Sequence, residues 1–258
     1  DDTEVLIHGK AYSGDDKNTA VRIKNSELHS SFDLTIVGDG APDSTGDLNQ
    51  GVRFKNGLVR VGDTSSALLD TSESGLPYWL TAVDQPVDST IDLTIKGLGG
   101  RGQQGNSGIS MKNTDLIVSG TILLEGRIQE QQWQNNPSVY ANGSLLSAGK
   151  SLVVDADFDA QIISSLLDAG EDILIRSNTL QLFDSSLNAL GEIFLQSENI
   201  TTDSTNVVGG RSDDSRDSSS ASQAETDVTS SISTVLSTRT LSLEEIEQLV
   251  LNQEQSSM

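Results

Sequence analysis

The stretch from Ser144 to Gly191 decides the fold, because it contains one short phrase three times. The copies are Ser144-Leu-Leu-Ser-Ala-Gly149, Ser165-Leu-Leu-Asp-Ala-Gly170 and Ser186-Leu-Asn-Ala-Leu-Gly191, and their glycines are 21 residues apart twice (170 − 149 = 21 and 191 − 170 = 21). An apolar run follows each glycine: Leu152-Val-Val154, Ile173-Leu-Ile175 and Ile193-Phe-Leu195. The third run starts one residue early, which a one-residue deletion in a turn would explain. A fixed period of about 20 residues with short β-type segments predicts a solenoid.

One repeat of this length forms two or three short strands and cannot bury its apolar side alone. Stacked repeats would pair their strands in parallel about 4.8 Å apart and place like side chains over like. The predicted inner set is Leu152, Val154, Ile173, Ile175, Ile193 and Leu195, and the outer set includes Ser151, Asp155, Asp172 and Arg176. The repeated glycine suits a corner that requires positive φ or a close approach of two backbones.

The first half repeats a different phrase, which ends in Lys-Asn. Its copies are Val21-Arg-Ile-Lys-Asn25, Val52-Arg-Phe-Lys-Asn56 and Ile109-Ser-Met-Lys-Asn113. Alternation followed by asparagine predicts a strand and then a turn residue in the left-handed region. A second apolar strand follows the first and third copies at the same distance. The equivalent strand after the middle copy, Ile91–Gly97, arrives about 28 residues late. We therefore expect residues 62–90 and 127–142, which contain three of the four prolines, to loop out of the stack.

Composition narrows the classes of function. Sixteen basic and 38 acidic residues give a net charge of −22, which opposes binding to nucleic acid or to an anionic membrane surface. No apolar run reaches the length of a membrane span. Cysteine is absent, so disulfides and thiolate metal sites are excluded. The chain starts at Asp1 without a signal peptide, and we expect it to be a mature or excised piece of a longer protein.

The composition changes near the end of the chain. Residues 209–240 are rich in serine and acidic residues and predict a disordered linker. Residues 241–258 contain a capping box, Ser242-Leu-Glu-Glu245, and apolar residues at helical spacing, which predict a short amphipathic helix. Residues 1–208 are then the solenoid domain.

Two groups of residues give the chain a resemblance to a known family. Leu93-Thr-Ile-Lys-Gly-Leu-Gly-Gly100 with Gly108-Ile-Ser-Met-Lys-Asn113, and the later Ala148-Gly149 and Ala169-Gly170 phrases, resemble the repeats of filamentous haemagglutinin-like bacterial exoproteins. The resemblance covers about residues 5–208. It implies an all-β fold, a single-stranded right-handed parallel β-helix. It also implies a secreted or cell-surface adhesin of the two-partner secretion type, exported through an outer-membrane partner.

An acidic stretch is the first candidate site. Asp155, Asp157 and Asp159 alternate along a predicted strand and would share one face, where they would hold Ca²⁺ or act as acid and base. An EF-hand loop is excluded, because its sixth and twelfth positions would be Ala160 and Leu166. The favoured interpretation is a solvated acidic corner, with a Ca²⁺ site and catalysis as alternatives.

Aromatic side chains on the expected loops are the best candidates for binding a glycan or a protein. They are Tyr78, Trp79, Trp133 and Tyr140, whose flat rings suit stacking on sugar faces. The alternative is that they fold back as lids over the solenoid wall. The only histidines, His8 and His29, have the same spacing as the repeated glycines (29 − 8 = 21) and would stack on adjacent repeats if that spacing is the period. Coincidence or a surface ladder is favoured over a metal-binding pair.

The sequence therefore predicts a non-enzymatic structural or adhesive segment that displays aromatic loops and needs no cofactor, with a Ca²⁺ ion at the acidic stretch as the alternative. The alternative of a different class is a polysaccharide lyase or glycoside hydrolase of the pectate-lyase or polygalacturonase type, with the three aspartates on the floor of a cleft.

Overall fold

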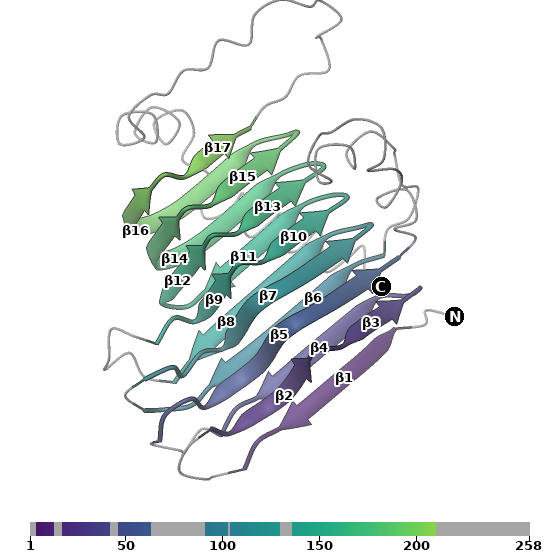
Figure 1. Ribbon diagram of the computed structural model, residues 1–258, viewed down its shortest axis with the longest axis vertical. Helices are drawn as coiled ribbons and strands as arrows, with labels where there is room; N and C mark the ends of the chain where they lie inside the picture. Colours follow the sequence, from purple (N-terminus) through teal and green to yellow (C-terminus); the bar gives the residue numbers. More distant parts are fainter. Residues whose placement is uncertain are drawn as a thin grey trace, which may run out of the picture. The chain divides into compact units, whose positions relative to one another are not determined.

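The described residues form an all-β structure. The computed structural model describes residues 4–12, 17–41, 46–62, 91–102, 104–129 and 136–209, and these contain no helix. Their 17 strands belong to one sheet in which every pairing is parallel, and Figure 1 shows them stacked in chain order. The strands are β1 (Val5–Lys10), β2 (Thr19–Lys24), β3 (Glu27–Ser30), β4 (Leu34–Asp39), β5 (Gln50–Val61), β6 (Leu93–Gly99), β7 (Ile109–Val118), β8 (Ile122–Ile128), β9 (Val139–Asn142), β10 (Leu145–Ala148), β11 (Leu152–Ala156), β12 (Asp159–Ile163), β13 (Leu166–Ala169), β14 (Ile173–Phe183), β15 (Ser186–Ala189), β16 (Ile193–Asp203) and β17 (Asn206–Val208).

The pairings arrange the strands in three columns of seven. Column A contains β1, β4, β6, β8, β11 and the first halves of β14 and β16. Column B contains β2, the first halves of β5 and β7, then β9, β12 and the second halves of β14 and β16. Column C contains β3, the second halves of β5 and β7, then β10, β13, β15 and β17. Seven successive repeats therefore each add one segment to every column, which is the arrangement of a solenoid.

The register confirms the predicted rows of side chains. Leu152 pairs with Ile173, which pairs with Ile193, and all three face the core. In column B, Val21 pairs with Val52 and Val52 with Ile109. Buried residues from all three columns form one hydrophobic core. Most core-facing side chains in the first and last repeats, such as Ile7 and Leu195, are only partly buried, because a terminal repeat has a neighbour on one side only.

The repeat length changes along the stack because one connection changes. Between columns A and B, the first four repeats use residues 11–18, 40–49, 100–108 and 129–138, which is eight to ten residues each. Repeat 5 uses only Asp157 and Phe158, and repeats 6 and 7 stay in one continuous strand. The steps along column A therefore shorten from Ile122 to Leu152 (152 − 122 = 30), to Ile173 (173 − 152 = 21) and to Ile193 (193 − 173 = 20). The last step is the shortest because the predicted one-residue deletion falls between columns A and B of repeat 6.

The repeated glycine works by close approach and not by positive φ. A Cβ at Gly149 would lie 2.1 Å from the Ser119 carbonyl oxygen, and one at Gly170 would lie 2.2 Å from the Gly149 carbonyl oxygen. Gly191 is not their equivalent, because Ala189 pairs with Ala169 and so places Leu190 in line with Gly170. The glycine of the third phrase is thus one residue out of register with the other two.

Positive φ occurs instead at the corner between columns B and C, once in each repeat. The residues are Asn25, Asn56, Asn113, Gly143, Ser164, Asp184 and Ser204, with φ between 40° and 59°. The left-handed asparagines predicted after each Lys are therefore confirmed.

The register also limits the two predicted excursions. Val61 pairs with Val118 and Leu93 pairs with Ile122. Residues 62–92 therefore connect column C of one repeat to column A of the next, where the following two repeats use only three residues each, 119–121 and 149–151. Residues 63–90 themselves lie outside the described part of the chain. The second excursion is shorter than predicted, because residues at both ends of 127–142 belong to β8 and β9. The predicted linker, beyond Gly209, and the predicted terminal helix also lie outside the described residues.

Candidate functional site

Asp155 lies on the outer side of β11 and binds two arginines. Its side chain is 13% exposed, and Arg176 donates to both of its oxygens, from Nε at 2.9 Å and from the terminal nitrogen at 2.8 Å. Arg127 donates to one of them at 2.7 Å. Burial opposes ionisation, but the hydrogen bonds from Arg176 and Arg127 outweigh it and lower the pKa of Asp155. Asp155 is therefore an ionised acceptor in a charge network that joins β8, β11 and β14.

Asp157 has a different environment in the short connection after β11. It accepts hydrogen bonds from the Ser138 hydroxyl and, at 3.1 Å, from the Ile128 backbone N–H. Burial is the main influence and raises the pKa of Asp157, although these hydrogen bonds act in the opposite direction. The carboxylate thus ties repeat 5 to the end of the long connection in repeat 4.

Asp159 is the first residue of β12 and is buried, with 8% exposure. The alternation that predicted a shared face assumes one continuous strand, whereas a corner separates Asp155 from Asp159. Among the described residues, no group of three or more His, Cys, Asp or Glu side chains is arranged to hold a metal ion. The structure thus does not gather the three aspartates.

Tyr140 is the one predicted aromatic binding residue within the described part of the chain. It lies at an outward position of β9, half-buried, and its hydroxyl accepts a hydrogen bond of 2.9 Å from Asn142 Nδ2. Tyr78, Trp79 and Trp133 lie outside the described residues. The ring of Tyr140 is therefore held on a strand of column B and is not on a loop.

The histidines do not stack. His8 lies on β1 and His29 on β3, in the same repeat and in different columns. His8 Nε2 is 2.8 Å from Asp39, and His29 Nε2 is 3.5 Å from Glu27. Their spacing (29 − 8 = 21) does not match the repeat of this half, in which Val5 pairs with Leu34 (34 − 5 = 29).

A buried asparagine ladder, which sequence reasoning missed, holds the long connections together. The Asn18 backbone N–H donates to Asn49 Oδ1 at 3.0 Å, the Asn49 N–H to Asn106 Oδ1 at 2.8 Å, and the Asn106 N–H to Asn136 Oδ1 at 3.0 Å. Asn49, Asn106 and Asn136 are at most 2% exposed. Each amide therefore satisfies a backbone donor of the preceding repeat that would otherwise be buried without a partner.

The ladder has a sequence signal. An asparagine stands three residues before the first large apolar residue of column B in Asn18-Thr-Ala-Val21, Asn49-Gln-Gly-Val52, Asn106-Ser-Gly-Ile109 and Asn136-Pro-Ser-Val139. The corner between columns B and C has a second ladder, in which the Ser144 N–H donates to Ser165 Oγ at 3.2 Å and the Ser165 N–H to Ser185 Oγ at 3.3 Å. Both ladders fix the geometry of the corners from one repeat to the next.

Comparison with known proteins identifies no relative: no protein-family model, no curated protein and no solved structure matches this chain. No helix long and apolar enough to cross a bilayer occurs among the described residues. The geometry of the repeats and of their outer faces is therefore the basis on which a function is assigned.

Proposed function

We propose that this chain is a right-handed parallel β-helix that serves as a non-enzymatic structural and adhesive segment of a secreted or cell-surface bacterial exoprotein. The observation that carries the proposal is the unbroken register of seven repeats, with the long connections restricted to the first four. Such a stack acts as a rod, and the connections act as the displayed elements.

The rod is stiff for a physical reason. Every repeat is hydrogen-bonded to its neighbours in three columns, and the corners add bonds such as Gly100 N–H to Asn49 O at 3.0 Å. Separating two repeats would break all of these bonds together and expose the core. A surface group on one repeat therefore keeps its distance from groups on the next repeat.

The displayed elements lie between fixed ends. The connection 129–138, which contains Trp133, runs between β8 and β9, and the insertion 62–92, which contains Tyr78 and Trp79, runs between β5 and β6. Aromatic residues between rigid ends supply contact area with a glycan or a host protein at a low loss of entropy. We propose that they make the adhesive contact and that the full-length protein is exported through an outer-membrane partner.

The acidic stretch supports a structural role in preference to catalysis. Both Asp155 oxygens are engaged by arginines, and Asp157 accepts hydrogen bonds from Ser138 and Ile128. An enzyme that cleaves acidic polysaccharides would need such carboxylates directed toward the substrate.

A loop replacement tests the proposal. Residues 62–92 are replaced by Ser-Gly-Thr, the residues that form the equivalent corner at 119–121, and the full chain and the variant are applied to a glycan array and to host cells. We expect the variant to keep its β-sheet circular dichroism and cooperative melting but to lose most of the binding to host cells and to uncharged glycans.

Two results would contradict the proposal. Release of reducing sugar from polygalacturonate, with or without Ca²⁺, that disappears in Asp157→Ala would favour the polysaccharide-cleaving alternative. Absence of any signal from the full chain on the array and on cells would leave a spacer with no ligand.

A further inference from the structure

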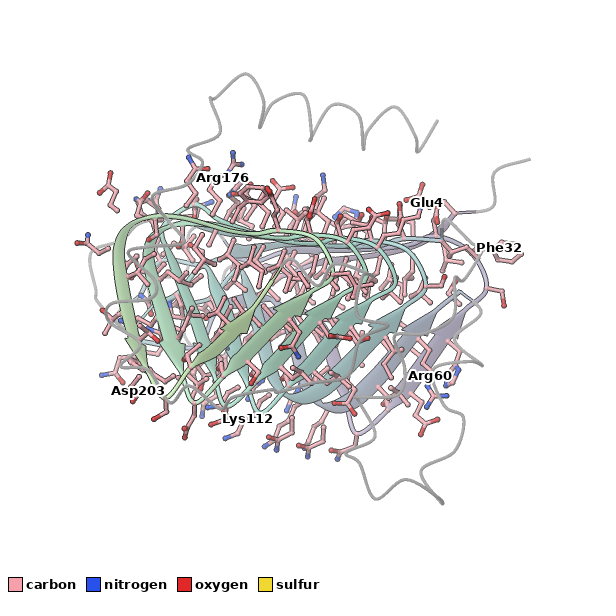
Figure 2. All side chains as sticks on the ribbon, turned by 90° about the horizontal axis from the view of Figure 1, so that it is seen from above. Glu4, Phe32, Arg60, Lys112, Arg176 and Asp203 are labelled. Atoms are coloured by element: carbon pink, nitrogen blue, oxygen red, sulfur yellow. The ribbon has the colours of Figure 1, made fainter. Side chains whose placement is uncertain are left out.

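The outer side of column B carries two rows of cations in the first three repeats. Arg22 pairs with Arg53 in one row, and Lys24 pairs with Lys55, which pairs with Lys112, in the other. Neighbouring members of a row are one strand spacing apart, about 4.8 Å. We call these five residues the basic face. Figure 2 shows Lys112 on the opposite side of the stack from Arg176, which belongs to the charge network of column A.

The basic face is not neutralised by neighbouring acids. None of its five residues forms an ion pair within the described part of the chain. In the column B segments of the first four repeats, namely β2, Gln50–Lys55, Ile109–Lys112 and β9, there is no Asp or Glu, although the chain has 38 acidic and only 16 basic residues. Like charges directly opposite on adjacent strands destabilise a sheet. A bound anion would reduce this repulsion between the cations of the basic face.

The same two rows continue into uncharged polar groups. Beyond Arg53 the first row passes through Ser110, Tyr140 and Gln161, and beyond Lys112 the second row reaches Asn142. The hydrogen bond from Asn142 to the Tyr140 hydroxyl joins the rows. Along the stacking direction, the outer side of column B therefore offers cations first and then a phenol ring and two amides, and the second row continues beyond Asn142 with the apolar Ile163 and Phe183.

A separate, exposed ladder of asparagines lies at the corner between columns B and C and borders the lysine row. Asn56 Nδ2 donates to Asn25 Oδ1 at 3.1 Å, and Asn113 Nδ2 donates to Asn56 Oδ1 at 3.2 Å. Each asparagine directly follows a lysine of the row. The lysines thus project from a backbone whose spacing is locked, which suits a polymer with regularly spaced charges.

We propose that the outer side of column B binds a linear acidic polysaccharide that lies along the stack, with its carboxylate or sulfate groups on the basic face and a sugar ring against Tyr140. Charge complementarity selects an anion, and the amides and hydroxyls of the later repeats suit the hydroxyls of sugars. A nucleic acid fits less well, since double-stranded DNA carries one charge per about 1.7 Å, whereas neighbouring cations in each row of the basic face are about 4.8 Å apart. The site lies on strands and does not depend on the segment 62–92.

Binding assays with matched variants test the proposal on the full chain. The probes are sodium polygalacturonate and dextran sulfate, with neutral dextran and single-stranded DNA for comparison, measured by calorimetry at low and moderate salt. The test variant is Lys24→Gln/Lys55→Gln/Lys112→Gln. The control is Lys10→Gln/Lys96→Gln/Lys150→Gln, which removes the same charge from the column A side.

We expect the test variant to lose affinity for the two anionic polysaccharides by at least about tenfold and to reduce the slope of log affinity against log salt by about two to three. The control should change affinity by less than about twofold, and the triple Lys→Arg version of the basic face should bind as wild type. Tyr140→Ala should weaken binding of polygalacturonate, and replacement of residues 62–92 should leave it unchanged. The test variant should melt no lower than wild type, because like-charge repulsion is removed.

Three results would overturn the proposal. Wild type that binds neither polysaccharide has no such site. Equal losses in the test and control variants would show attraction to the whole molecule and no defined face. Tighter binding of single-stranded DNA than of either polysaccharide would assign the basic face to nucleic acid.

Discussion

The first four repeats and the last three share one core register but turn the corner between columns A and B in two different ways. Repeats 1–4 leave column A after a glycine and return through eight to ten residues, whereas repeats 5–7 pass the corner in one strand or with two residues. The glycines Gly9, Gly38, Gly97 and Gly126 stand in line, and the next position in the same row is Ala156. The long connection, and not the sheet, therefore creates the need for glycine.

The physical reason lies in how the long connection returns. In repeat 3, a Cβ at Gly97 would lie 2.0 Å from the Gly108 carbonyl oxygen, at the start of column B. In repeat 4, a Cβ at Gly126 would lie 2.3 Å from the Ser138 carbonyl oxygen. Repeat 5 has no returning segment, so Ala156 is accommodated with 3% exposure. A repeat protein can thus lengthen one corner without disturbing its core, provided that a glycine precedes the excursion.

Gly97→Ala should cause the largest loss of stability among the substitutions that distinguish the two kinds of repeat. The overlap is with backbone atoms that the sheet holds in place, so we expect a loss of at least about 3 kcal/mol in the free energy of unfolding, or failure to fold. Chemical denaturation followed by circular dichroism measures it. Ala156 occupies the same row in repeat 5, which has no long connection, so Ala156→Gly should cost only about 1 kcal/mol. Equal effects at the two positions would disprove the role of the returning segment.

Asn106→Ala should have the next largest effect. It removes the Oδ1 acceptor of the buried Asn49 N–H and leaves that donor unsatisfied, and it also leaves a small cavity. We expect a loss of about 2 to 3 kcal/mol. Asn188→Ala, at an outward position of β15 in repeat 6, should change stability by less than about 0.5 kcal/mol. A loss at Asn106 as small as this would show that water replaces the ladder.

The junction between the two kinds of repeat should be sensitive to pH. Asp155 has a lowered pKa, so its contribution is complete above the ordinary value of 3.8 and is lost as the pH falls through the lower folded pKa. We expect Asp155→Asn to cost about 1 to 2 kcal/mol at neutral pH, because both arginines are at least one third exposed. The difference from wild type should shrink below pH 3.8, as measured by thermal melts across pH.

Asp157→Asn is the matched variant, and its difference in stability from wild type should change with pH in the opposite direction. Burial raises the pKa of Asp157, so this group binds its proton more tightly in the folded chain than in the unfolded chain. Its contribution to stability therefore grows as the pH falls through the raised folded pKa toward the ordinary value of 3.8. Compared with Asp157→Asn, wild type should gain stability on acidification. Parallel pH curves for the two variants would contradict the two assigned shifts.

The rows of the core were predictable because they follow from period and alternation alone. The spacing that joins Leu152 to Ile173, and the Lys-Asn phrases that end at Asn25, Asn56 and Asn113, both have direct counterparts in the register. The predicted equivalence of Gly170 and Gly191 is wrong because the two phrases look alike in sequence, while the deletion at the preceding corner between columns A and B has already shifted the register. Similar residues at a fixed spacing do not show where a deletion falls.

The corner chemistry was not predictable to the same degree. The asparagine ladder involves residues 30 to 57 positions apart, and repeats of unequal length hide such a match until the strands are aligned. The shared face predicted for the acidic stretch is wrong for a related reason, since Asp155, Asp157 and Asp159 alternate in sequence across a corner that divides two columns. Alternation gives faces only within a strand whose ends are known.

The smallest predicted effect concerns the corner between columns B and C, where repeats 1–3 have asparagine in the left-handed region and repeat 5 has Ser164, with φ of 48°. Glycine adopts this conformation without the clash of a Cβ, so Ser164→Gly should stabilise by about 0.5 kcal/mol after its larger loss of entropy is included. Asn113→Gly should instead destabilise by a similar amount, because asparagine tolerates positive φ and its Nδ2 donates to Asn56. Denaturation midpoints of the two variants should therefore move in opposite directions. Stabilisation by both substitutions would mean that the asparagine ladder at this corner contributes nothing to stability, and that the left-handed backbone conformation alone decides which residue is favoured there. Destabilisation by both would contradict the expected relief of a Cβ clash at Ser164.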